Sequence, residues 1–176
     1  MKSIMLATDG SPSAEDATRE AIELASELHV PLTVVSVAHA ELPFTGYYGY
    51  ATTDVIAELC KIEREHVEAV LAAVRERATA AGVAGETVAL EGMPGEEICK
   101  AAQERDVRLL VVGAHGWGRM GRMFHGSVSE YVLHHADAPV LVVAGDEEAS
   151  RDAREGLPDL SQRVHPVQVP VVVRPR

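Results

Sequence analysis

The chain has 176 residues, of which 47% are hydrophobic, so it is long enough for one domain with a sizeable core and a short appendage. Its formal net charge of −11 argues against a general surface for nucleic acid or for an anionic membrane. The N-terminus turns polar at Asp9, too early for a signal peptide, and no apolar run approaches the roughly 18 residues of a membrane span. We therefore expect a cytoplasmic protein.

Strand and helix patterns alternate along the chain, which is typical of a parallel sheet with crossover helices. Apolar runs predict strands at about 2–8, 31–39, 86–91, 108–113 and 139–143. Helices are predicted to begin at Pro12, at Thr53 or Asp54, at Pro94 and near Ser127. Ser11 is the expected N-cap of the first helix, and Gly82 is the expected stop of the second. The second helix is predicted to turn one face inward, formed by Val55, Leu59, Ile62, His66, Val70 and Val74.

These elements predict an α/β fold, a doubly wound five-stranded parallel sheet with helices on both faces. The strand order expected for it is 3-2-1-4-5, because right-handed crossovers then place the switch point between the first and fourth strands. That order brings Asp9 and the segment 113–127 together at the carboxyl edge of the sheet, where ligands bind in such folds.

The segment 113–127 reads G-A-H-G-W-G-R-M-G-R-M-F-H-G-S, between a buried-type strand and an amphipathic helix. Strand-to-helix loops usually need about 2–6 residues, so a loop this long is interpreted as holding a ligand. Its glycines let backbone N–H groups approach an anion, and the helix that follows adds its positive end. No Asp or Glu occurs between Val107 and Ser129, although Arg119 and Arg122 do. The alternative is a flexible loop in which Ser127 only caps the helix, with Glu130 completing a capping box.

The spacing Gly113-x2-Gly116-x9-Gly126-Ser127 resembles the signature of the ATP-binding branch of the universal stress protein family. The resemblance extends from residue 1 to about 145 and includes Ala7-Thr-Asp-Gly-Ser11, Pro31-Leu-Thr-Val-Val-Ser-Val37 and Ala138-Pro-Val-Leu-Val-Val143. It implies ATP as ligand, accompanied by Mg²⁺. The nucleotide-binding residues that it implies are Ala7, Thr8, Asp9, Val37, Val112, Gly113, His115, Gly116, Arg119, Gly126, Ser127, Val128 and Ser129.

Two of these residues have specific roles under the resemblance. Val37 ends the second strand, where related proteins hold adenine through backbone groups. Asp9 ends the first strand and is expected to bond the ribose or to reach the phosphates through a divalent metal. The alternative for Asp9 is an Asx-type turn or a cap for the helix that follows. The resemblance also implies a homodimer formed across the strand 139–143.

Other chemistries are less well supported by the sequence. The G-x-G-x-x-G at Gly116–Gly121 follows the fourth strand, whereas a dinucleotide fingerprint belongs in the first strand-to-helix turn. The histidines lack a zinc-binding spacing. Cys60 and Cys99 fit neither a disulfide framework nor a metal pattern and are interpreted as buried thiols. His115 and His125 are the only histidines expected near the site, and nothing fixes either as a general base, so we do not expect an enzyme.

The sequence therefore predicts an adenine-nucleotide-binding protein with at most slow, incidental ATP hydrolysis. Two alternatives stay open: a nucleotide-independent dimeric interaction module, and a binder of another adenine ligand such as a cyclic nucleotide. Residues 146–176 are predicted to be a C-terminal extension outside the domain 1–145. Their valines and prolines indicate either an extended arm packed on its own or the partner subunit, or a weakly ordered terminus.

Overall fold

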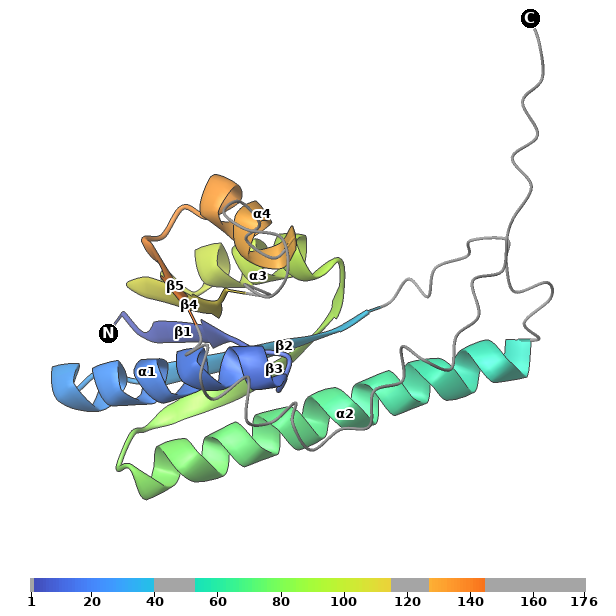
Figure 1. Ribbon diagram of the computed structural model, residues 1–176, viewed down its shortest axis with the longest axis horizontal. Helices are drawn as coiled ribbons and strands as arrows, with labels where there is room; N and C mark the ends of the chain where they lie inside the picture. Colours follow the sequence, from blue (N-terminus) through green and yellow to red (C-terminus); the bar gives the residue numbers. More distant parts are fainter. Residues whose placement is uncertain (1, 40–52, 115–126, 145–176) are drawn as a thin grey trace, which may run out of the picture. The chain divides into compact units, whose positions relative to one another are not determined.

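The strands form one five-stranded parallel sheet in the order β3-β2-β1-β4-β5, in a computed structural model that describes residues 2–39, 53–114 and 127–144 (Figure 1). The strands are β1 (Ile4–Ala7), β2 (Leu32–His39), β3 (Gly85–Gly92), β4 (Leu109–Gly113) and β5 (Val140–Val143). The helices are α1 (Pro12–Leu28), α2 (Thr53–Ala80), α3 (Pro94–Glu104) and α4 (Ser127–His135). This order and the alternation of elements confirm the predicted fold class.

The sheet separates two layers of hydrophobic core, because successive side chains of a strand point to opposite faces. Ile4 and Leu6 of β1 pack with α1 and α2, in a cluster that includes Ala17, Ala21, Val67 and Leu71. Met5 and Ala7 pack with α3 and α4, in a cluster that includes Ile98, Ala101, Leu110 and Val132. Figure 1 shows α1 and α2 on one side of the sheet and α3 and α4 on the other. Strands buried on both faces explain the continuous apolar runs of the sequence.

The strand register aligns the carboxyl ends at the middle of the sheet. Ala7, the last residue of β1, lies opposite Val35 of β2 and Val112 of β4. The chain leaves β1 toward β2 on one side and returns to β4 on the other, so the switch point lies between β1 and β4, as predicted.

Local signals placed the helix ends correctly. Ser11 occupies the N-cap position of α1 and Pro12 its first turn, although the Ser11 side chain makes no capping hydrogen bond. Gly82 follows α2 with φ +73°, and the Val83 N–H donates to the Ala78 carbonyl at 2.9 Å, which closes the helix.

The predicted inward face of α2 is wrong in its N-terminal half. Leu59 and Ile62 are 40% and 52% exposed, and His66 is exposed as well. Among the α2 side chains that the structure describes, the buried ones begin at Val67 and continue with Leu71, Val74 and Ala78. Of the predicted face, Val74 is buried and Val70 partly buried, whereas the side chain of Val55 lies outside the described part. Tertiary packing decides where along a long helix the sheet covers it.

Three further observations concern the described residues. No helix among them is long and apolar enough to cross a membrane.

Cys60 and Cys99 are free and only partly buried, so their prediction as buried thiols is too strong. Burial, aided by the negative charge of Asp137, raises the pKa of the Cys99 thiol. Met1–Asp146 forms one compact unit, whereas the predictions for the C-terminal extension fall on residues outside the described part.

Candidate functional site

A cleft of about 640 Å³ opens at the carboxyl edge of the sheet, at the switch point between β1 and β4. It is lined by the ends of β1, β2 and β4, by the first turns of α1, α3 and α4, and by part of α2. A cleft in this position is where parallel α/β sheets bind their ligands. Its volume suits a ligand of nucleotide size.

Most of the site residues predicted from the sequence line this one cleft. They are Ala7, Thr8, Asp9, Val37, Val112, Gly113, Ser127, Val128 and Ser129. The other predicted residues, His115, Gly116, Arg119 and Gly126, lie outside the described residues. The topology thus brings together segments that are more than a hundred residues apart in the sequence, such as Asp9 and Ser129.

The turn after β1 is held by one hydrogen bond to β2 and by hydrogen bonds within the turn itself. The Thr8 N–H donates to the Val35 carbonyl at 3.1 Å, and the Gly10 N–H donates to the Thr8 hydroxyl oxygen at 3.2 Å. The Ser11 N–H donates to Oδ1 of Asp9 at 2.9 Å, which is the Asx-type turn considered as an alternative. Asp9 is exposed and also lines the cleft. An ionised carboxylate has about four acceptor positions, so this turn is compatible with a ligand contact at the same side chain.

The first turn of α4 forms a second wall of the cleft. Ser127 is exposed there and Ser129 is buried, while Val132 one turn later anchors the helix in the core. The N-terminus of a helix carries unpaired N–H groups and a partial positive charge, both of which favour an anion. The described lining contains no Lys or Arg, so helix N-termini are its source of positive potential, and the first turn of α4 provides one of them beside those of α1 and α3.

The third wall is apolar. Val35 and Val37 of β2 and Pro94 and Ile98 of α3 contribute to this part of the lining, and Val35 and Ile98 are buried in one core cluster. Such a surface suits a flat, weakly polar group such as a nucleobase. Val37 was expected to end this strand, but β2 continues to His39.

Sequence reasoning missed the contribution of α2. Glu63, His66 and Val67 line the cleft, so His115 and His125 are not the only histidines near it. The His66 ring Nε2 lies 3.2 Å from the Asp9 carbonyl oxygen. A carbonyl oxygen can only accept, so Nε2 carries the hydrogen and donates it. The available signal was His66 itself, the one polar residue in the face of α2 that was predicted to turn inward.

The cleft is not a preformed metal cage. Among residues 2–39, 53–114 and 127–144, no group of three or more His, Cys, Asp or Glu side chains is placed to hold a metal ion. Mg²⁺ is commonly bound through one or two carboxylates together with substrate phosphates. Asp9, a single carboxylate in the cleft lining, is compatible with Mg²⁺ binding of this kind, in which phosphates of the ligand supply other oxygens.

Comparison with known proteins gives consistent matches over the same region. The profile of the Universal stress protein family matches residues 1–144. A universal stress protein of Methanocaldococcus jannaschii is 34% identical over 142 residues, which is 81% of each chain. A crystal structure of a family protein from Burkholderia pseudomallei is 32% identical, with a TM-score of 0.64 over 82% of this chain and 96% of its own. The universal stress protein of Archaeoglobus fulgidus in complex with dAMP is 27% identical, with a TM-score of 0.54 over 81% of this chain and 97% of its own.

Proposed function

This chain belongs to the universal stress protein family, and we propose that its cleft binds an adenine nucleotide, with ATP as the preferred ligand. The observation that carries the proposal is the cleft itself, in which an apolar wall, the Asp9 carboxylate and the first turn of α4 surround one space. The dAMP complex of the Archaeoglobus relative supports an adenine ligand.

Each part of the ligand has a matching wall. The base would lie between Val37 and Pro94, the ribose near Asp9, and the phosphates at the α4 N-terminus beside Ser127 and Ser129. The glycines of the G-x2-G-x9-G-S spacing precede that helix directly in the sequence and would add backbone N–H donors. That spacing is the reason for preferring ATP over a nucleotide with fewer phosphates.

Mg²⁺ would enter with the nucleotide. Asp9 is the residue that would hold it, because a bare carboxylate beside a triphosphate needs a cation between them. The bound ion would screen the phosphate charge, while the hydrogen bond from the Ser11 N–H keeps the carboxylate in place.

We propose binding without efficient catalysis. Backbone amides, serine hydroxyls and a metal-bridged carboxylate stabilise the ground state and the transition state alike, and such uniform binding does not accelerate a chemical step. Nε2 of His66 already donates its hydrogen to the Asp9 carbonyl, so that nitrogen is not disposed to act as a base. We expect ATP turnover far below the typical enzyme value of about 10 s⁻¹. Rapid, Mg²⁺-dependent phosphate release by the purified protein would overturn this assignment.

The decisive experiment combines mass spectrometry with calorimetry. The purified protein is denatured and the supernatant is analysed for released nucleotide. Nucleotide-free protein is then titrated with ATP, AMP, cyclic AMP and adenosine. We expect binding in the order ATP, AMP, adenosine. Tightest binding of cyclic AMP would make the protein a cyclic-nucleotide binder, and no binding at all would favour the interaction module.

A charge placed at the α4 N-terminus locates the phosphates. Ser127→Glu should weaken ATP binding strongly and adenosine binding little, because only ATP carries phosphates that the new carboxylate repels. An acid in the first turn favours a helix, so the variant should stay folded. Ser26→Glu is the matched control, because Ser26 is exposed on α1 and does not line the cleft. Equal loss of ATP and adenosine in Ser127→Glu would contradict the proposed orientation.

We also propose that the protein forms a homodimer through β5. This strand is the last in the order, so its outer edge pairs with no strand of the described sheet. All four of its residues are only partly buried within one chain. Apolar side chains on an open strand edge are a template for pairing with another copy.

A further inference from the structure

One face of α2 contacts the turn that carries Asp9. Along that face, His66, Val70 and Arg77 follow one another at spacings of four and seven residues, which places them on one side of a helix. His66 donates to the Asp9 carbonyl at 3.2 Å. Val70 lies against Gly10, and Arg77 reaches the first turn of α1. Going along α2 from His66 to Arg77, the contacted residues advance from Asp9 and Gly10 in the turn to Glu15 in α1.

The contact with Gly10 is very close. A Cβ atom on Gly10 would lie 2.5 Å from Cγ2 of Val70, nearer than real Cβ atoms approach a neighbour. Gly10 also has φ +72°, in the left-handed region. The turn therefore lies directly on α2.

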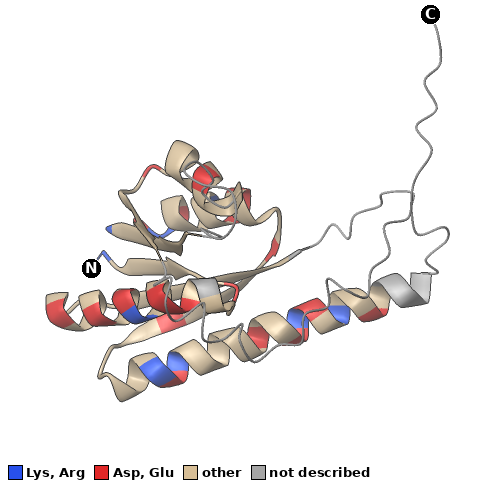
Figure 2. Ribbon diagram, in the orientation of Figure 1, with Lys and Arg blue, Asp and Glu red and all other residues tan. Residues whose placement is uncertain are grey.

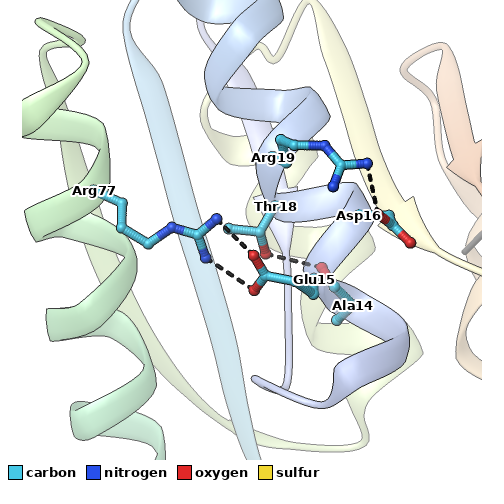
Figure 3. Close-up of polar contacts among 6 residues, drawn as sticks. All are labelled: Ala14, Glu15, Asp16, Thr18, Arg19 and Arg77. Atoms are coloured by element: carbon cyan, nitrogen blue, oxygen red, sulfur yellow. Dashed lines mark hydrogen bonds and ion pairs between the residues drawn. The ribbon is translucent and has the colours of Figure 1, made fainter. Parts of the chain in front are cut away.

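The Arg77 contact fixes the neighbouring turn of α1. Two guanidinium nitrogens of Arg77 meet the two carboxylate oxygens of Glu15 at 2.7 and 2.9 Å, as Figure 3 shows. A two-point contact of this kind specifies orientation as well as distance. α2 thus contacts both the turn, at Asp9 and Gly10, and the start of α1, at Glu15.

The turn needs such a contact because glycine does not hold a conformation by itself. Gly10 populates positive and negative φ with similar ease, so the peptide between Asp9 and Gly10 depends on the hydrogen bonds of its own N–H and C=O groups. Its N–H donates to the Thr8 hydroxyl oxygen within the turn. The His66 hydrogen bond acts on the carbonyl of that same peptide. Rotation of this peptide would move the Ser11 N–H, which in turn holds Oδ1 of Asp9.

We propose that His66 is a positioning residue of the cleft, which fixes the Asp9–Gly10 peptide and so holds the Asp9 carboxylate toward the ligand. The expected effect of His66 on affinity rests on the proposed nucleotide binding. The effect of His66 on the conformation of the turn does not, because it is present in the protein without ligand. His66 acts through Asp9, and no direct contact between His66 and the nucleotide is required.

The test uses substitutions that keep α2 intact. His66 is exposed, and alanine is a better helix former than histidine, so His66→Ala should fold normally. His66→Gln supplies an amide N–H near the position of the ring Nε2 and serves as the rescue variant. Glu68→Ala is the matched control, because Glu68 is exposed on the same helix and does not line the cleft.

The first measurement needs no ligand. Amide exchange rates of Gly10 and Ser11, measured by NMR in the nucleotide-free protein, should rise about two- to tenfold in His66→Ala, the range for loss of one hydrogen bond. They should return toward the wild-type rates in His66→Gln and stay unchanged in Glu68→Ala. The Leu110 amide, in the core of the sheet, serves as the internal reference. Unchanged rates at Gly10 and Ser11 in His66→Ala would overturn the proposal.

The second measurement is ATP affinity by calorimetry. His66→Ala should weaken binding about two- to tenfold, and His66→Gln should restore it. In an Asp9→Ala background, His66→Ala should cause no further loss, because the residue through which it acts is gone. An equal loss in both backgrounds would overturn the proposal by showing that His66 acts on its own. If the wild type binds no nucleotide, the proposed function fails, and the exchange rates still decide whether His66 holds the turn.

Discussion

At the scale of single residues, Gly10 and Gly82 show two reasons for a glycine in this fold, a positive φ angle and a lack of space for a side chain. Gly10 and Gly82 have nearly the same backbone angle, with φ +72° and +73°. Around Gly82 nothing lies within 4 Å of an added Cβ, whereas at Gly10 the added atom would meet Val70. At position 82, glycine is therefore favoured only by the positive φ angle. At position 10, it is favoured both by the positive φ angle and by the close approach of Val70.

This difference predicts the cost of alanine at each position. Gly82→Ala should lower the free energy of unfolding by roughly 1–2 kcal/mol, the usual cost of a left-handed non-glycine residue. Gly10→Ala should cost about 1–3 kcal/mol more, because the new methyl group overpacks against Val70. Urea unfolding of both variants measures the difference.

A double variant provides the control. Val70→Ala opens the space beside Gly10, so Gly10→Ala in that background should cost no more than Gly82→Ala. If Gly10→Ala and Gly82→Ala are equally destabilising in the wild-type background, the close contact between the turn and α2 is wrong.

At the scale of elements, the link between α1 and α2 specifies geometry more than it stabilises the fold. The side chains of Glu15 and Arg77 are 56% and 41% exposed, so water and salt screen their attraction. Exposed ion pairs typically contribute about 0.2–1 kcal/mol, even with good geometry.

We predict a small, salt-sensitive coupling between these two residues. A double-mutant cycle with Glu15→Ala and Arg77→Ala should give a coupling of about 0.5–1 kcal/mol in the free energy of unfolding. In about 1 M salt, where the screening length falls to about 3 Å, the coupling should nearly vanish. The pair Lys61 and Glu65, exposed on one helix, is the reference for an ordinary surface contact. A coupling well above 1 kcal/mol that survives salt would show that the pair is shielded from solvent.

Also at the scale of elements, the sequence predicted what depends on local signals and on topology. Pro12, Pro94 and Gly82 mark helix ends through their backbone chemistry, and each was placed correctly. Strand order followed from alternation and crossover handedness, and this order alone brought Asp9 near Ser127.

What the sequence could not predict depends on where α2 crosses the end of the sheet. His66 was assigned to the buried face by its period, yet it is exposed and donates to a carbonyl 57 residues earlier in the chain. Likewise, Glu15 and Arg77 are 62 residues apart and belong to no motif. Contacts of this kind are set by the relative placement of two helices, which no short-range pattern encodes.

At the scale of the whole molecule, the two edges of the sheet allow a controlled test of the proposed dimer. Val142 of β5 and Val88 of β3 are both partly buried and pack against the same core cluster, but they belong to opposite edge strands. Val142→Asp should give monomer or insoluble protein, because it leaves an unpaired charge at the proposed interface. Val88→Asp makes the same chemical change away from it and should leave the dimer intact. Sedimentation that shows a stable dimer for Val142→Asp, or dissociation by both variants, would contradict the assignment to β5.

Charge on the whole molecule bears on the C-terminal extension. Asp and Glu residues are spread along α1 and α2 (Figure 2). Residues 147–176 contain five acidic and five basic residues, so the formal net charge of −11 belongs entirely to residues 1–146. Removing the extension therefore leaves the net charge that opposes an incoming anion the same.

A chain that ends at Asp146 should accordingly bind ATP as the full-length protein does. Met1–Asp146 forms a compact unit by itself, and every described residue of the cleft lies between Ala7 and Ser129. We expect the free energy of unfolding to stay within about 0.5 kcal/mol of the full-length value, as for changes away from the core. Calorimetry and urea unfolding of the two chains test this directly. Weaker ATP binding with unchanged stability would show that the extension reaches the nucleotide, whereas lower stability with unchanged affinity would show that its valines pack on the domain.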